Sequence, residues 1–255
     1  MKLSAAVMAH PVREPQVLEL LGALDREVPV SWDTAGPPSS DPRQRWRNGR
    51  RAWEMHDPDA DWHMVIQDDA LVVPDLLAGL EAALEHVPPE AIVCPYVGTK
   101  RPHKARVNAA VKIATEQGAR WLSMRSLNWG VAIVAPVESI DRMLEWCDTQ
   151  TLMSYDKRIG VYYRDVLGWR TWYPFPSLVD HREGPSICGH SHSGRVAHRM
   201  HTGSALEVDW SGPVLDMRDI KVPETWSAQP LDAETLERRR RKREARLAKA
   251  AASVL

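Results

Sequence analysis

Residues 62–69 read Trp62-His-Met-Val-Ile-Gln-Asp-Asp69, an apolar run that ends in one amide and two carboxylates. The apolar part is typical of a buried strand. In open parallel sheets ligands bind outside the carboxyl ends of the strands, so Asp68 and Asp69 are expected to face a ligand. A pair of carboxylates there favours Mg²⁺ or Mn²⁺, with phosphate oxygens as further ligands. The alternative is that both acids only end the strand and cap the next helix.

Strands and helices alternate on both sides of this segment. An apolar strand over residues 2–9 is followed by apolar residues at helical spacing over 14–24 and by a second strand, 28–32, that ends at Asp33. The same patterns predict helices over 43–56, 75–86 and 137–147 and strands over 91–97 and 131–134. We therefore expect an α/β fold with a mainly parallel sheet covered by helices on both faces. The sequence contains no glycine-rich phosphate loop of the dinucleotide or P-loop type.

The composition of the chain excludes several broad classes. The chain has 255 residues, 44% of them hydrophobic, which is enough to form one or two compact domains. Its formal net charge is −1, so no overall positive charge attracts it to nucleic acid or to membranes. No run approaches the roughly 18 apolar residues of a membrane helix. Three cysteines, Cys94, Cys147 and Cys188, are too few for a disulfide framework, so a cytoplasmic protein is expected.

The carboxyl-terminal end differs from the rest of the chain. Residues 231–255 hold eight Lys or Arg against four acids, and their composition favours a helix. We expect residues 1–230 to form the main domain and 231–255 a basic helical tail, which is either solvated or bound to a partner.

A histidine ends a second apolar run, Pro176-Ser-Leu-Val-Asp-His181. A neutral imidazole ligates the same divalent cations as a carboxylate, so His181 could complete a site begun by Asp69; otherwise it is a hydrogen-bonded structural histidine. Further on, Cys188 is followed by four histidines, which raises a zinc site as an alternative to a mobile loop: His190, His192, His198 and His201.

Asp156 follows Tyr155 at a predicted helix start. It is either a cap or a general base, which must lie within hydrogen-bond reach of a substrate proton.

Two segments concentrate positive charge. Five arginines without an acid fall within residues 43–51, and guanidinium groups match phosphate oxygens, so a diphosphate is a natural partner; a solvated helix face is the alternative. Residues 100–125 hold seven Lys or Arg against one acid, with Trp121 and Trp129 nearby, which suits an anionic acceptor.

Taken together, these motifs resemble the nucleotide-sugar glycosyltransferases of the GT-A fold, particularly small enzymes of phages and actinobacteria. The matching segments span roughly residues 3–190 and are Val7–Arg13, Trp53–Asp69, Leu127–Ile133, Tyr155-Asp156 and Pro176–His181. The resemblance implies a donor half at about 1–98 and an acceptor half at about 99–230. Acceptor-binding residues would be Lys104, Arg106, Trp129 and Gly130.

The resemblance also implies roles in the donor half. His10 and Arg13 would lie under the nucleotide, and Asp33 near its base or ribose. Arg47 and Arg51 would approach the diphosphate. Asp68 and Asp69 match the last two positions of the family's Asp-any-Asp motif, where Asp69 is the metal ligand and Asp68 reaches ribose, sugar or metal. Gln67 replaces the first acid and removes one charged ligand.

In the same family a late histidine joins the metal, here His181, and an acid deprotonates the acceptor, here Asp156. The implied activity is metal-dependent transfer of a sugar from a nucleotide sugar, with a UDP-sugar favoured, to an acceptor hydroxyl. A hydroxymethylated base of phage-type DNA is the favoured acceptor, with protein and glycan as alternatives. A different class of function, a non-catalytic nucleic-acid-binding module with a zinc-bound histidine loop, would leave Asp68, Asp69 and Asp156 without a role.

Overall fold

A computed structural model describes residues 1–39, 41–99, 104–184, 187, 195–220 and 241. The chain divides into two units, Met1–Ile220 and Lys221–Leu255. Apart from Arg241, the predicted basic tail lies outside the described residues. Among the residues that are described, no helix is long and apolar enough to cross a membrane.

The first half alternates between strands and helices as predicted. Its elements are β1 (Leu3–Ala9), a 3-10 turn η1 (Pro11–Arg13), α1 (Glu14–Ala23), β2 (Val30–Trp32), α2 (Pro42–Glu54), β3 (Trp62–Gln67), β4 (Ala70–Val72), α3 (Leu76–Leu84) and β5 (Ala91–Val93). Asp69 is followed by the short strand β4 and caps no helix. The predicted strand over 91–97 ends at Val93, two residues before Pro95, which has no N–H for a sheet ladder.

The second half contains three strands that local patterns did not predict, β6, β8 and β10. Its elements are α4 (Lys104–Gln117), β6 (Trp121–Met124), β7 (Ala132–Pro136), η2 (Val137–Ser139), α5 (Ile140–Asp148), α6 (Tyr155–Val161), the π-helical turn η3 (Tyr162–Val166), β8 (Arg170–Pro174), β9 (Val179–His181), η4 (Ala205–Glu207) and β10 (Val214–Asp216).

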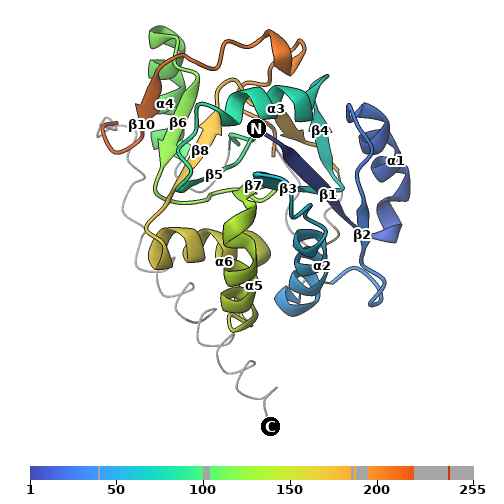
Figure 1. Ribbon diagram of the computed structural model, residues 1–255. Coiled ribbons are helices and arrows are strands. Elements are labelled where there is room, and N and C mark those ends of the chain that lie inside the picture. Colours follow the sequence, from blue (N-terminus) through green and yellow to red (C-terminus); the bar gives the residue numbers. More distant parts are fainter. Residues whose placement is uncertain (40, 100–103, 185–186, 188–194, 221–240, 242–255) are drawn as a thin grey trace. The chain divides into compact units, whose positions relative to one another are not determined.

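Eight strands form one sheet in the order β10-β6-β8-β5-β7-β3-β1-β2, and β4 pairs with β9 in a separate two-stranded sheet (Figure 1). In the large sheet β1 is parallel to β2 and β3, and β5 is parallel to β8. β7 is antiparallel to both β3 and β5, and β6 is antiparallel to β8. Five strands therefore share one direction, which confirms the α/β fold with a mainly parallel sheet.

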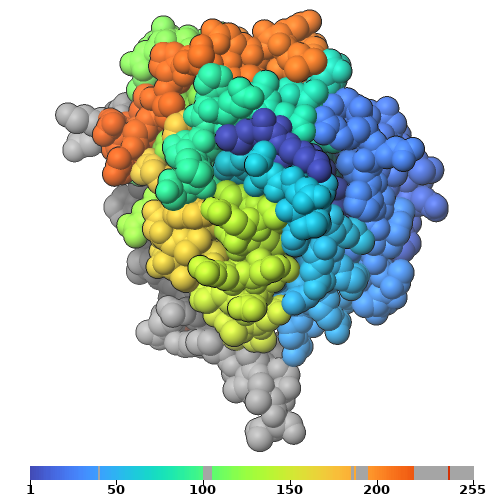
Figure 2. All heavy atoms as spheres, in the orientation of Figure 1, coloured from blue at the N-terminus to red at the C-terminus, as the bar shows by residue number. Residues whose placement is uncertain are grey.

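Helices cover both faces of this sheet. Because successive side chains of a strand point to opposite faces, Met64 and Ile66 of β3 pack into the core beneath α1, α3 and α4, while Val65 packs against α2, α5 and α6. Figure 1 shows α2, α5 and α6 together on one side of β3 and β7. In Figure 2 the N-terminal end, in dark blue, lies at the surface between α3 and the segment that leads into β3.

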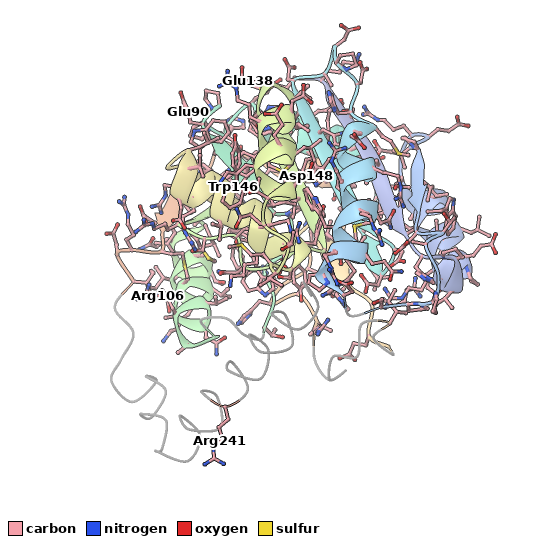
Figure 3. All side chains as sticks on the ribbon, turned by 90° about the horizontal axis from the view of Figure 1, so that it is seen from below. Glu90, Arg106, Glu138, Trp146, Asp148 and Arg241 are labelled. Atoms are coloured by element: carbon pink, nitrogen blue, oxygen red, sulfur yellow. The ribbon has the colours of Figure 1, made fainter. Side chains whose placement is uncertain are left out.

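Polar contacts fix α2 against α5. Asp148, at the end of α5, accepts hydrogen bonds from the Trp46 Nε1 at 2.7 Å and from the Arg50 Nε at 3.0 Å. Figure 3 labels Asp148 between these two helices. Arg50 is therefore used in helix packing, whereas the sequence had grouped it with the arginines expected to meet a diphosphate.

Candidate functional site

The candidate site lies at the carboxyl edge of the parallel strands. β1, β2 and β3 end at this edge, where they are followed by His10, Asp33 and Asp68. Because β7 is antiparallel to β3, with Ile66 opposite Ala132, the residue Gly130 before β7 lies at the same edge. Candidate residues from distant parts of the sequence therefore lie together at this edge of the sheet.

Asp68 is buried and held by two donors. Its Oδ2 accepts a hydrogen bond from the His10 backbone N–H at 2.9 Å, and its Oδ1 accepts one from the Arg13 Nη1 at 2.7 Å. Burial and the neighbouring charge of Asp69 raise the pKa of the Asp68 carboxyl above its ordinary value, although Arg13 acts in the opposite direction. The Arg13 guanidinium therefore stabilises the charged form of a carboxylate whose burial disfavours charge.

Asp69 and His181 are brought together by the small sheet, in which β4 and β9 pair with Ala70 opposite His181. The Arg182 N–H donates to the Asp69 carbonyl at 2.7 Å. This register places the His181 Nε2 3.3 Å from the Asp69 Oδ2.

The donor atoms of this pair fit a divalent cation. The His181 Nδ1 lies 2.8 Å from the Arg182 carbonyl oxygen, which can only accept, so Nδ1 carries a proton and Nε2 is the ring nitrogen left to bind a cation. Asp69 is 8% exposed, and its Oδ1 has no hydrogen-bond partner among the described residues. A buried carboxylate oxygen without a partner calls for an additional ligand such as a cation.

The protein supplies only part of a full metal coordination shell. Within the described ranges, no group of three His, Cys, Asp or Glu residues gathers around one point. Mg²⁺ and Mn²⁺ commonly take one or two carboxylates and complete their shell with water and substrate phosphates. The Asp69–His181 pair is therefore compatible with a metal shared with a phosphorylated ligand.

A small cavity adjoins this pair. It is lined by Arg13, Asp69, His181, Arg182, Glu183, Gly184 and Arg195. Sequence reasoning missed Arg182 and Arg195, although Arg182 directly follows His181. The lining thus combines three guanidinium groups with two carboxylates and one imidazole, and guanidinium groups are donors that match the oxygens of a diphosphate.

His10 and Asp33 shape the loops that follow β1 and β2. The His10 Nδ1 accepts from the Val12 N–H at 3.2 Å, so its Nε2 is the nitrogen that donates to the Gly36 carbonyl at 3.2 Å. Asp33 accepts from the Ala35 N–H at 3.2 Å and from Gln44 at 3.4 Å. Both side chains are buried. Their contacts with a nucleotide stay a prediction.

The remaining donor-side arginines lie on α2. Arg51 donates to the carbonyl of Trp32, the last residue of β2, at 3.0 Å and is otherwise exposed. Arg47 is exposed on the same helix. Arg43 pairs with Asp41 at the start of α2. Arg51 therefore lies at the carboxyl edge, and its contact with a diphosphate stays a prediction.

Asp156 reaches the same edge from α6. Tyr155 is buried and accepts a hydrogen bond from the Trp53 Nε1 at 3.0 Å, which fixes the start of the helix. Asp156 is half-buried and accepts from the Ser154 hydroxyl at 2.8 Å. A Cβ built on Gly130 would lie 2.7 Å from the Asp156 Cβ and 3.6 Å from the Gln67 amide nitrogen. Asp156 therefore lies beside the end of β3.

The expected acceptor residues divide into different environments. Trp129 is 9% exposed and packs edge-on against Tyr96 and Tyr173, with ring centroids 5.8 and 5.5 Å away, so its ring belongs to the core. Arg106 is exposed on α4 and is labelled in Figure 3. Lys104 begins α4, but its side chain and residues 100–103 lie outside the described part of the chain.

Most of the histidine-rich segment also lies outside the described residues, including Cys188, His190 and His192. The two histidines that are described have local partners: His198 bonds the Asn108 side chain and His201 the Ser204 carbonyl, each at 3.0 Å.

The other two cysteines, Cys94 and Cys147, are buried free thiols. Burial raises the pKa of each thiol to about 12, so neither is a nucleophile at neutral pH.

No family model matches the sequence. No curated protein matches it at a significant level. Similar arrangements occur among solved structures; one is a mannose-1-phosphate geranyltransferase from Thermus thermophilus, with a TM-score of 0.30 and 12% identity, covering 68% of this chain and 74% of that chain. At this level of similarity the match indicates no ligand or reaction. Both have to be inferred from the residues at the carboxyl edge.

Proposed function

We propose that this protein is a metal-assisted glycosyltransferase that moves a sugar from a nucleotide sugar to an acceptor hydroxyl. The observation that carries the proposal is the approach of the His181 Nε2 to the Asp69 Oδ2, with the Oδ1 of the same carboxylate left without a partner among the described residues, beside a cavity with three arginines. Carboxylate and imidazole ligands suit a divalent cation, and guanidinium groups suit a diphosphate. The resemblance of the sequence to GT-A glycosyltransferases supports the same function.

In this proposal the donor binds along the carboxyl edge. His10 and Asp33 shape the loops that face the nucleoside, and Arg51 and Arg182 lie where anionic oxygens would be held. Asp69 and His181 would hold Mn²⁺ or Mg²⁺, which when bound neutralises charge on the departing diphosphate. Asp68 keeps the loop after β1 in place through the His10 N–H.

Asp156 is the proposed general base. It takes the proton of the acceptor hydroxyl while the hydroxyl oxygen bonds to the anomeric carbon of the sugar and the bond from that carbon to the diphosphate oxygen breaks. The nucleoside diphosphate leaves with the electron pair. Ser154 orients the carboxylate by donating to its Oδ1, and Gly130 leaves room for it at the edge of the sheet.

The proposal is tested by incubating the full chain with a panel of nucleotide sugars and Mn²⁺ and measuring release of nucleoside diphosphate. We expect Asp156→Asn to keep nucleotide binding and to lower turnover by about 10²- to 10⁴-fold, as is typical when a general base is removed. Asp165→Asn is the control, since Asp165 is exposed and paired with Arg164. If no nucleotide sugar is consumed, or if Asp156→Asn turns over normally, the proposed reaction or the proposed base is wrong.

We further propose an anionic acceptor, with DNA that carries a hydroxymethylated base as the first candidate. The support is the basic stretch over residues 100–125, of which Arg106 and Arg125 are exposed. On duplex DNA each phosphate contact contributes roughly −0.9 to the slope of log affinity against log salt, so neutralising Lys104 and Arg106 should make the slope shallower. Transfer to a peptide or a neutral glycan with no transfer to DNA would assign a different acceptor. DNA binding without any sugar transfer would instead favour a non-catalytic module.

A further inference from the structure

A cation already lies between the two acids of the candidate metal site. The Arg13 Nη1 is 2.7 Å from the Asp68 Oδ1 and 2.6 Å from the Asp69 Oδ2. The side chains of all three residues are nearly buried, at 13%, 7% and 12% exposed respectively. One guanidinium nitrogen therefore bridges two carboxylates that would otherwise repel each other.

The position of this nitrogen conflicts with that of a metal. The Asp69 Oδ2 that Arg13 contacts is also the oxygen 3.3 Å from the His181 Nε2. A divalent cation shared by Asp69 and His181 would bind the carboxylate through this Oδ2, with the unpartnered Oδ1 as a second ligand atom. At about 2.0 to 2.6 Å from Oδ2, the cation would be at most about 5 Å from the Arg13 nitrogen. Two positive groups at this separation in a nearly buried site destabilise each other. Because arginine does not lose its proton in proteins, the conflict can be relieved only by moving the side chain.

The cavity offers a reason for Arg13 to move. Arg13 is one of the residues that line it, together with Arg182 and Arg195. The cavity has a volume of only about 20 Å³, so a diphosphate could enter only if lining side chains such as Arg13 moved. Its anionic oxygens would then face the guanidinium, whose planar group of donors matches phosphate. Arg182 is held differently, by an ion pair with Glu19. Among the described residues, no hydrogen bond joins its side chain to the carboxylate of Asp68 or Asp69.

We propose that Arg13 is the counter-ion of Asp68 and Asp69 in the free protein and that a divalent cation replaces it only when a diphosphate draws the guanidinium away. The inference rests on the proposed function, because it assumes that Asp69 and His181 hold the metal. Its consequence is that the metal and the nucleotide bind with positive coupling, in which each raises the affinity for the other by the same factor.

The test measures Mn²⁺ binding to the full chain from the electron paramagnetic resonance signal of free Mn²⁺, with and without uridine diphosphate, corrected for Mn²⁺ bound by the nucleotide alone. In the wild-type protein we expect weak Mn²⁺ binding that uridine diphosphate strengthens on the order of tenfold or more. Arg13→Gln should bind Mn²⁺ alone more tightly by a similar factor and lose most of the coupling. Arg218→Gln, which removes an exposed arginine paired with Asp216 away from this cavity, should leave Mn²⁺ affinity and its coupling to uridine diphosphate unchanged.

The outcomes separate this inference from the function on which it rests. If Arg13→Gln binds Mn²⁺ no more tightly than wild type while Asp69→Asn abolishes binding, the role of Arg13 is overturned and the metal site stands. If Asp69→Asn binds Mn²⁺ as wild type does, both the inference and the metal site are overturned. If no nucleotide sugar is consumed but Arg13→Gln shows the tighter binding and the lost coupling, the inference stands and the proposed reaction fails.

A second pair of variants covers the case in which Arg13→Gln does not fold, since it leaves two buried carboxylates without their cation. Asp68→Asn removes one of these charges, and the double variant Arg13→Gln with Asp68→Asn then leaves only Asp69 ionised. The double variant should bind Mn²⁺ more tightly than Asp68→Asn alone. Equal affinities in these two proteins would contradict the replacement of Arg13 by the metal.

Discussion

Gly130 lies directly against Asp156, and a methyl group on Gly130 would approach the Asp156 Cβ to 2.7 Å. Cβ atoms are not found that close to another carbon, so any larger residue at position 130 must displace the carboxylate or the start of α6. The absence of a side chain at Gly130 is therefore a condition for the present position of Asp156.

The first prediction concerns this contact. Gly130→Ala should destabilise the protein by about 1 to 3 kcal/mol, as overpacking does, and should lower sugar transfer because it displaces the proposed base. Gly22→Ala in α1 is the matched control, since nothing lies within 4 Å of a Cβ there, and it should instead stabilise the helix by about 0.5 to 1 kcal/mol. Urea unfolding and transfer rates measured on both variants check the prediction. Normal transfer by Gly130→Ala would show that Asp156 need not occupy this position.

The second prediction concerns the unpartnered oxygen of Asp69. Asp69→Asn keeps the size of the side chain but removes the charge that the His181 Nε2 and the Arg13 Nη1 both approach. Transfer that depends on Mn²⁺ should be lost, while the circular dichroism spectrum stays that of the wild type. Full-rate transfer by this variant in the presence of a chelator would contradict the assignment of Asp69 as a metal ligand.

Local sequence patterns predicted the first half of the fold well because its elements are defined by short-range periodicity. The runs before His10, Asp33 and Asp68 are strands, and the carboxyl edge follows from their parallel pairing. β6, β8 and β10 were missed because these short segments were not recognised from local pattern and are ordered by pairing with one another and, for β8, with β5.

The site could be predicted only where a residue follows an apolar strand. Asp69 and His181 were both found in this way, and the pairing of β4 with β9 that joins them depends on contacts between distant segments. Trp129 was expected on an acceptor surface, but its ring is buried between two tyrosines, a position that no local pattern indicates. The hydrogen bonds from Arg13 to Asp68 and Asp69 could not be predicted either, because a sequence does not say where a long side chain points.

The third prediction tests the packing of η4 on α3. A Cβ on Gly79 would lie 2.2 Å from the Ala205 Cβ and 2.8 Å from the Ala205 carbonyl carbon. Gly79→Ala should therefore destabilise the protein by about 1 to 3 kcal/mol, although the same change in an exposed helix is stabilising. The thermal midpoint should fall without a change in nucleotide binding. A rise in the midpoint would mean that residues 205–207 do not pack against α3.

The last prediction concerns His63, which is fully buried in β3. Its Nε2 bonds the Ala52 carbonyl at 3.0 Å and its Nδ1 the Ser4 hydroxyl at 2.9 Å, so the neutral ring is satisfied. Burial lowers the pKa of His63 to about 4 from an ordinary 6.5, and the nearby His56 adds to the effect. The unfolded chain therefore binds a proton below pH 6.5 that the folded protein does not bind until about pH 4.

The stability that His63 contributes is accordingly complete above pH 6.5 and is lost as the pH falls from 6.5 to about 4. A shift of this size corresponds to about 3 kcal/mol in the free energy of unfolding. His63→Gln, whose amide can still donate to Ala52, should show a shallower fall in this free energy between pH 7 and pH 4 than the wild type, whatever its stability at pH 7. Urea unfolding at a series of pH values measures both slopes. Parallel slopes for the two proteins would mean that the buried imidazole takes up its proton in the folded state as readily as in the unfolded chain.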